Sequence, residues 1–420
     1  MIHASTPEEL APLVALCKQG KLYEVQSWIA QGGPIAPPEG ARGKGAHALP
    51  LRIAIDCGFH SLVQVLLEAG APVRERGYRA LDHAVSLRRP DLAELLFKHG
   101  ASVDDVSMQF VLEMWDPDMV ALLRAHGASL EKSRPVAFAL IAKMRPVLGI
   151  VKREGEANPD LLAQAGIALR YHANEGNAKW VSLLLWAGAD ACERGIYRVE
   201  DLDAEPDEDD DGPSALELAV GAGKLEILKV PRMLAACRSP KAASGSLLEA
   251  ACFGAEPEIL SFLFAQGHVP SALPDRGTRA IDLVLHSMTF EFPSLYSLPG
   301  ANQRTAIDSS RARGRMKALH HLLAHGAAWL PAPHDITRVR RSLLKMAPGY
   351  LLEFAWLLGA YRAARRRDVL DLFRPPSVAR LLGEKRKTAE QILAGIPEEL
   401  EIPFAPPPPT GPLEQAPRTA

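Results

Sequence analysis

A leucine-rich segment that ends in glycine recurs along the chain about every 30 residues. Three copies read GFHSLVQVLLEAGAPV from Gly58, RRPDLAELLFKHGASV from Arg88 and WDPDMVALLRAHGASL from Trp115. A period of this length indicates a stack of similar units rather than one compact core. The glycine that ends the segment is found at Gly70, Gly100, Gly127, Gly155, Gly188, Gly267, Gly326 and Gly359.

Each unit is expected to contain two short helices. In HALPLRIAIDCGFHSLVQVLLEAGAPV, the proline of PLRIAIDC fits the first turn of a helix, and Gly58 ends that helix. Gly70 ends the second helix in a left-handed conformation. Two helices this short cannot bury a wide apolar stripe alone, so neighbouring units must stack on one another. The stripe of the second helix consists of Leu62, Val63, Leu66 and Leu67.

The units resemble the ankyrin repeat, whose pattern is a hairpin loop, T-P-L-H-x-A-A-x-x-G, a second helix with V-V-x-x-L-L, and G-A-D-V. LPLRIAIDCG followed by LVQVLLEAGAPV matches it, as do YRALDHAVSLR, PSALELAVGAGKLEIL, GSLLEAACFGAEPEIL and GTRAIDLVLHS. The resemblance, to a divergent bacterial-type member of the family, covers about residues 10 to 363. It implies an all-α fold, an ankyrin-repeat solenoid of about ten helix-turn-helix units with short hairpin loops and a helical C-terminal cap.

The Thr-Pro-Leu-His tetrapeptide of the family is never intact in this chain. In the family its histidine forms hydrogen bonds between units, so the resemblance implies less regular units here. The histidine position holds Arg52, Asp82, Arg170, Glu217, Glu249 and Asp282.

Breaks in the period divide the 420-residue chain. N-terminal repeats are expected over 1–192 and C-terminal repeats over 214–363, with a long insertion at 287–315. Between them, 193–213 reads as a projecting acidic loop, because a run this charged cannot pack. Residues 364–396 are expected to form the helical cap, and 397–420 a disordered proline-rich tail.

The residues favour no catalytic, metal or cofactor site. His321 and His325 have the i, i+4 spacing of zinc ligands but lack the glutamate and the third ligand of the known motif. GAGK at Gly221–Lys224 lacks the serine or threonine of a phosphate-binding loop, and the acidic run 205–211 lacks the glycine of a calcium loop. The five scattered cysteines have neither disulfide nor zinc spacing. We therefore expect a protein that is not an enzyme.

The sequence favours a cytoplasmic location, because it contains neither a recognisable signal peptide nor an apolar run of ~18 residues. Secretion as an effector without such a signal stays an alternative. The net charge of -2 disfavours a nucleic-acid binder. We predict a protein-interaction scaffold that binds a protein partner on the concave ankyrin groove, with no small-molecule substrate and no membrane. The alternatives are an immunity-type protein that neutralises a toxin, an effector that binds host proteins, and a nucleic-acid adaptor that uses the basic C-terminal region.

Partner-binding positions follow from the resemblance, because ankyrin repeats bind through hairpin tips and the exposed edge of each first helix. The tips give Arg74, Arg76 and Tyr78, and Trp186 falls on an exposed position of a second helix. Three further tryptophans, Trp28, Trp180 and Trp356, fall on core positions and are expected to be structural. The groove positions are Leu87, Glu113, Met114, Asn174, Glu175 and Phe253.

Overall fold

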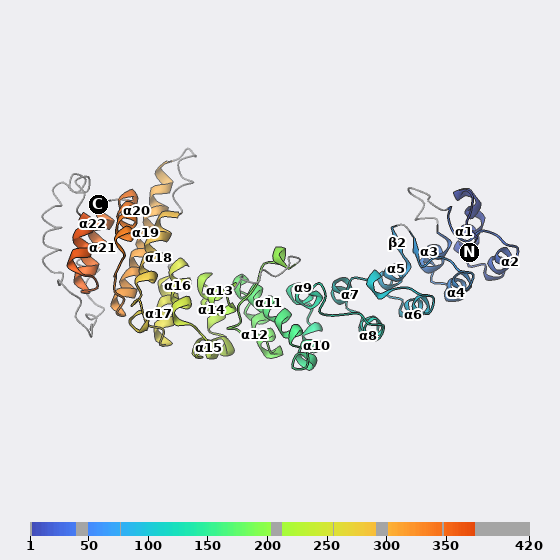
Figure 1. The fold of residues 1–420 in the computed structure, drawn as a ribbon, viewed down its shortest axis with the longest axis horizontal. Helices are drawn as coiled ribbons and strands as arrows, with labels where there is room; N and C mark the ends of the chain where they lie inside the picture. Colours follow the sequence, from blue (N-terminus) through green and yellow to red (C-terminus); the bar gives the residue numbers. More distant parts are fainter. Residues whose placement is uncertain are drawn as a thin grey trace. The chain divides into compact units, whose positions relative to one another are not determined.

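The protein is all-α, with one two-stranded hairpin in the part of the chain that the structure describes. The computed structural model describes residues 2–38, 49–75, 77–202, 212–254, 256–290, 301–346 and 348–373 (Figure 1). The chain forms two compact units, which divide between Ala168 and Leu169, and a segment that begins at Arg198 belongs to the first unit. The dividing point lies within one helix, α11 (Pro159–Glu175). None of the described helices combines the length and apolar character that crossing a membrane requires.

The first unit is built from consecutive helix pairs. The first helices of successive pairs contact one another (α1 with α3, α3 with α5, α7 with α9), and the second helices do the same (α2 with α4, α4 with α6, α6 with α8). These two layers are visible in Figure 1. The helices are α1 (Ala11–Lys18), α2 (Leu22–Ala30), α3 (Pro50–Asp56), α4 (His60–Glu68), α5 (Ala80–Ser86), α6 (Pro90–Lys98), α7 (Met108–Met114), α8 (Pro117–Ala125), α9 (Pro135–Ile141) and α10 (Val147–Glu154), with strands β1 (Arg74–Glu75) and β2 (Tyr78–Arg79) between α4 and α5.

The second unit continues the same pairing. One layer runs α13, α16, α18, α20 and α22, each in contact with the next, and α17, α19 and α21 follow one another in the other layer. The second helix of one pair is split before Pro231 into α14 and α15. The helices are α12 (Ala178–Ala187), α13 (Ala215–Gly221), α14 (Leu225–Leu228), α15 (Pro231–Cys237), α16 (Ser244–Gly254), α17 (Pro257–Ala265), α18 (Thr278–Phe290), α19 (Ala301–Ala324), α20 (Pro333–Met346), α21 (Pro348–Ala360) and α22 (Arg366–Phe373).

The predicted core stripe is buried. No residue of the stripe on α4 is more than 4% exposed; the stripe consists of Leu62, Val63, Leu66 and Leu67. They are buried because each helix packs its apolar side against its partner helix and the neighbouring pairs. Most of the predicted helix-ending glycines have positive φ. The φ angles are 89° at Gly70, 85° at Gly100, 91° at Gly127, 119° at Gly188, 98° at Gly267 and 85° at Gly326.

The glycine prediction is wrong for Gly359 and only partly right for Gly155, which ends α10 but not in a left-handed conformation. Gly155 follows α10 with φ of -63°, and the chain passes to α11 without a hairpin. A side chain at Gly155 would meet Leu162 at 2.8 Å, so this glycine permits close packing instead of a left-handed turn. Gly359 lies inside α21, and Arg362, with φ of 49°, takes the left-handed position beyond its end.

Several predicted segments lie partly outside the described residues. Helices α18 and α19 extend from either side into the predicted insertion 287–315, and 291–300 is outside the description. Residues 203–211 of the predicted acidic loop are also outside it. In the predicted cap, residues 364–373, which include α22, are described, and residues 374–396 and the proline-rich tail lie outside the description.

Candidate partner-binding surfaces

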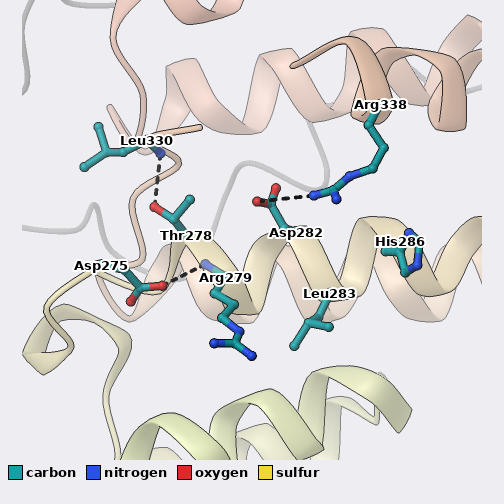
Figure 2. Close-up of a pocket in the computed structure, with 8 residues that line it drawn as sticks. All are labelled: Asp275, Thr278, Arg279, Asp282, Leu283, His286, Leu330 and Arg338. Carbon is teal, nitrogen blue, oxygen red and sulfur yellow. Dashed lines mark hydrogen bonds and ion pairs between the residues drawn. The ribbon is translucent and has the colours of Figure 1, made fainter. Parts of the chain in front are cut away.

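A pocket of about 390 Å³ lies in the second unit between α18 and α20 (Figure 2). Its central side chain is Asp282, at a position where the ankyrin pattern has histidine. Oδ1 of Asp282 accepts a hydrogen bond of 3.1 Å from the indole Nε1 of Trp329, and Oδ2 lies 4.0 Å from Nη2 of Arg338. The lining residues are Asp275, Thr278, Arg279, Asp282, Leu283, His286, Leu330 and Arg338.

The position of Asp282 changes its acidity. Burial raises the pKa of the Asp282 carboxyl to about 6, and the carboxylates of Asp335 and Asp275 act in the same direction. The Trp329 hydrogen bond and the charge of Arg338 lower the pKa, but by less than burial raises it. Asp282 is therefore ionised at neutral pH, but its surroundings only partly stabilise the negative charge.

The hairpin between α4 and α5 corrects one predicted partner-binding residue. β1 and β2 are antiparallel, with Arg74 opposite Arg79 and Glu75 opposite Tyr78. Tyr78 is only 5% exposed, its ring makes an edge contact with His83, and its hydroxyl is buried without a hydrogen-bond partner. The prediction of Tyr78 as an exposed anchor is therefore wrong, because strand alternation turns it inward.

Burial also raises the pKa of the Tyr78 phenol, and the nearby charge of Arg52 opposes this shift. The guanidinium of Arg52 lies 5.6 Å from the centre of the Tyr78 ring. Tyr78 thus belongs to the packing between α3 and the hairpin. The predicted tip residue Arg76 lies outside the described residues.

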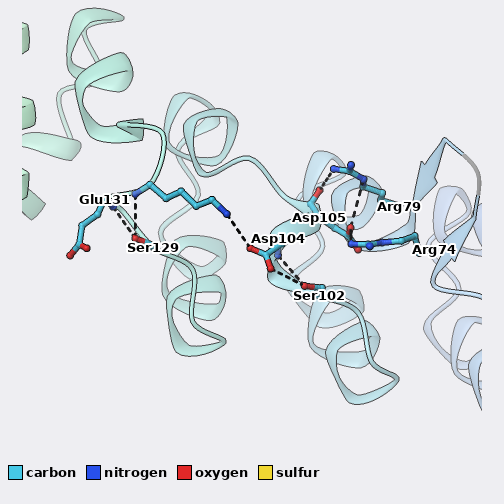
Figure 3. Close-up of polar contacts among 8 residues, drawn as sticks. Arg74, Arg79, Ser102, Asp104, Asp105, Ser129 and Glu131 are labelled. Atoms are coloured by element: carbon cyan, nitrogen blue, oxygen red, sulfur yellow. Dashed lines mark hydrogen bonds and ion pairs between the residues drawn. The ribbon is translucent and has the colours of Figure 1, made fainter. Parts of the chain in front are cut away.

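Arg74, another predicted tip residue, is held by the next hairpin loop (Figure 3). Its Nη2 forms an ion pair with Oδ1 of Asp105, and Nε of Arg79 lies 3.7 Å from the same oxygen. The Asp105 side chain is 2% exposed, whereas the Arg74 and Arg79 side chains are 59% and 57% exposed. The two arginines therefore connect successive loops around a buried carboxylate.

Removing the two arginines should cost more than removing the carboxylate. The double variant Arg74→Ala/Arg79→Ala leaves Asp105 buried without a cation, and we expect a loss of about 3 kcal/mol. Asp105→Ala leaves two exposed arginines that water can solvate, with a loss of about 1 kcal/mol. Urea unfolding of the three proteins measures the difference, and an Asp105→Ala protein that is the less stable would contradict it.

An exposed apolar surface of the first unit contains two other predicted residues. Leu87, after α5, is 42% exposed, and Phe110 of α7 is 40% exposed. Met114, one turn after Phe110, is half-buried. Arg88 brings the two helix ends together, because its Nη2 donates a 2.8 Å hydrogen bond to the Met114 carbonyl. We call Leu87, Phe110 and Met114 the α5–α7 surface.

Glu113, also predicted for the groove, is exposed beside this surface. Its Oε1 accepts a 3.0 Å hydrogen bond from Nε2 of Gln109. Sequence reasoning named Leu87, Glu113 and Met114 but missed Phe110. The signal was present, since Phe110 and Met114 have the i, i+4 spacing that places both on one side of a helix.

The predicted residues of the second unit are spread over several helices. Asn174 and Glu175 close α11, and Phe253, near the end of α16, is 73% exposed. Trp186 is 48% exposed and lies on α12, in the layer of second helices, as predicted. Phe253 therefore lies at a first-helix end, like Leu87 in the first unit. Of the three tryptophans predicted to be structural, Trp180 is buried, and Trp28 and Trp356 are half-buried.

The histidines of α19 make contacts within the protein. His325 Nδ1 lies 2.8 Å from the carbonyl of His321, and its ring stacks on Phe264. The hydroxyl of Tyr361 lies 2.7 Å from Nε2 of His320. Among the described residues, no group of three or more histidine, cysteine or carboxylate side chains is arranged to hold a metal ion.

A cysteine–histidine contact that sequence reasoning missed lies in the second unit. Sγ of Cys237 is 3.4 Å from Nε2 of His268, and Oγ of Ser244 is 2.8 Å from Nδ1 of the same ring. Nε2 is also 2.7 Å from the Cys237 carbonyl. Burial raises the pKa of the Cys237 thiol to about 11, so the sulfur stays protonated and is a poor nucleophile at neutral pH.

Comparison with known proteins gives no family. No protein-family model matches the chain, and no curated protein sequence is significantly similar to it.

Proposed function

We propose that this chain is a divergent ankyrin-type repeat protein that acts in the cytoplasm as a non-enzymatic scaffold and binds a protein partner. Stacked helix pairs with glycine turns support the ankyrin-type reading. The observation that carries the binding proposal is the exposure of large apolar side chains at the ends of first helices. Leu87 directly follows α5 and Phe253 lies near the end of α16, and Phe110 lies one turn before the last residue of α7.

The energetics of the α5–α7 surface favour an interaction role. Complete burial of a leucine or phenylalanine side chain is worth about 1.5–3 kcal/mol, so covering the 42% of Leu87 and the 40% of Phe110 that are exposed would gain about 1 kcal/mol each. Interfaces gain most of their affinity from a few such residues. The polar groups beside them, Glu113 and Arg88, suit the rim of an interface.

The basic C-terminal region gives less support to nucleic-acid binding. Arg338 pairs with Asp335 at 2.9 Å, and Arg365 pairs with Asp368 at 2.6 Å. Nη1 of Arg340 donates a hydrogen bond to a backbone carbonyl, that of residue 371. These arginines form ion pairs and hydrogen bonds within the chain, so a protein partner is better supported than a nucleic acid.

The test is affinity capture from native cells by the full chain, with quantitative mass spectrometry. The double variant Leu87→Asp/Phe110→Asp places charges on the α5–α7 surface without touching the buried stripe. We expect it to lose the specific partner by more than about tenfold, since two apolar contacts exceed 1.4 kcal/mol together. The purified partner is then titrated against both proteins.

Tyr23→Asp is the matched control, because Tyr23 is 81% exposed on α2, in the layer of second helices of the same unit. It should retain the partner at wild-type level. Equal capture by all three proteins would contradict the proposal. So would binding to DNA that falls steeply with salt.

A further inference from the structure

We propose that the pocket around Asp282 binds a cationic side chain, an arginine guanidinium or a lysine ammonium, presented by the protein partner. The inference rests on the proposed function and adds a second contact point, in the second unit, with defined chemistry.

The two carboxylate oxygens of Asp282 have different partners. Oδ1 is held by the Trp329 indole at 3.1 Å. Oδ2 has Arg338 at 4.0 Å, which is too long for a hydrogen bond. A carboxylate whose side chain is only 15% exposed gains most from a charged donor close to its second oxygen. The pocket thus presents an acceptor that lacks a close donor.

The two arginines that line the pocket form their shortest ion pairs with carboxylates other than Asp282. Nη2 of Arg338 is 2.9 Å from Oδ1 of Asp335, and Nε of Arg279 is 3.0 Å from Oε1 of Glu249. Figure 2 shows the Arg279 guanidinium directed away from Asp282. Each arginine thus has its shortest ion pair with a carboxylate other than Asp282.

Other carboxylates lie near Asp282. Asp275 already accepts backbone hydrogen bonds from Gly277 at 3.0 Å and Arg279 at 2.9 Å, so it caps the start of α18. The other titratable groups near Asp282 are Asp335 on α20 and His286, one turn further along α18. An incoming cation therefore meets a carboxylate with one oxygen that lacks a close donor, in a pocket whose two arginines are paired with Asp335 and Glu249.

The size and the lining of the pocket also suit a cationic side chain. A volume of about 390 Å³ is at the small end of ligand pockets, which suits one long side chain better than a cofactor. Leu283 and Leu330 supply apolar walls. The methylene stem of lysine or arginine packs on such walls while its charged head reaches a carboxylate.

The experiment uses the full chain and blocked arginine, N-acetyl-arginine N-methylamide, at pH 7.5. Binding is followed by the NMR signal of the Trp329 indole N–H, which is assigned with Trp329→Phe. The neutral isostere N-acetyl-citrulline N-methylamide is the matched ligand control, and Asp282→Asn the matched protein control. Each control should bind at least about tenfold more weakly, because loss of one charge of a buried pair costs more than 1.4 kcal/mol.

Equal binding of the citrulline compound, or unchanged binding by Asp282→Asn, would overturn the proposal. Tighter binding of free arginine than of the blocked amide would overturn the assignment to a protein side chain in favour of a small metabolite. The probe contains no partner protein, so its failure leaves the Leu87→Asp/Phe110→Asp result untouched. Failure of partner capture likewise leaves the probe result untouched.

Discussion

Replacing Trp329 with alanine is expected to lower the local free energy of unfolding around α18, α20 and α21 by about 4 kcal/mol. The Trp329 side chain is fully buried and makes an edge contact with Phe354, with ring centroids 5.2 Å apart. Its indole N–H is bonded to Asp282, and its backbone N–H donates to the Ala363 carbonyl at 2.6 Å. The variant combines a large cavity with a buried carboxylate that has lost its donor.

Amide hydrogen exchange measures this effect locally, which matters because each helix pair contacts mainly the neighbouring pairs. Protection should fall in α18 and α20 and stay unchanged in α4 of the first unit. Trp186→Ala is the matched control, since Trp186 is 48% exposed and its loss should cost less than about 1 kcal/mol. A Trp329→Ala protein with wild-type exchange in α18 would contradict the assignment.

The pairing of helices could be predicted from the sequence because its signals are local. The stripe of α4 and the turn at Gly70 depend on residues within one unit, and both predictions are confirmed. Gly155 and Gly359 carry the same signal, yet Gly155 ends α10 without a left-handed turn and Gly359 lies inside α21. The conformation of Gly155 depends on close packing against Leu162, and that of Gly359 depends on the continuation of α21. Neither can be predicted from the glycine and its nearest neighbours in sequence.

The candidate site was less predictable, because its chemistry depends on residues distant in sequence. In the sequence, Asp282 stands out only as a departure from the histidine of the ankyrin pattern. Its donor, Trp329, lies 47 residues further along the chain and was not singled out. Tyr78 shows the opposite error, since a residue assigned to an exposed tip is buried by a strand too short to reveal its alternation.

The acidity of Asp282 predicts a pH dependence of opposite sign to that of most paired carboxylates. Its pKa is about 6 in the folded protein and near 4 in an unfolded chain, so the folded state holds the proton more tightly. The associated stability is present below pH ~4 and is lost as pH rises through about 6. Between pH 4.5 and 7.5 this one group should lower the stability around α18 by about 2 kcal/mol.

Asp282→Asn removes that titration, while its amide oxygen can still accept the Trp329 hydrogen bond. We therefore expect the variant to gain about 2 kcal/mol relative to wild type between pH 4.5 and pH 7.5, measured by hydrogen exchange in α18 with correction for the intrinsic exchange rate. Glu258→Gln, which removes an exposed carboxylate from α17 of the same unit, should show no such pH-dependent difference. If the stability difference between Asp282→Asn and wild type is the same at both pH values, burial does not perturb Asp282, because a pKa left near 4 would add no slope in this range.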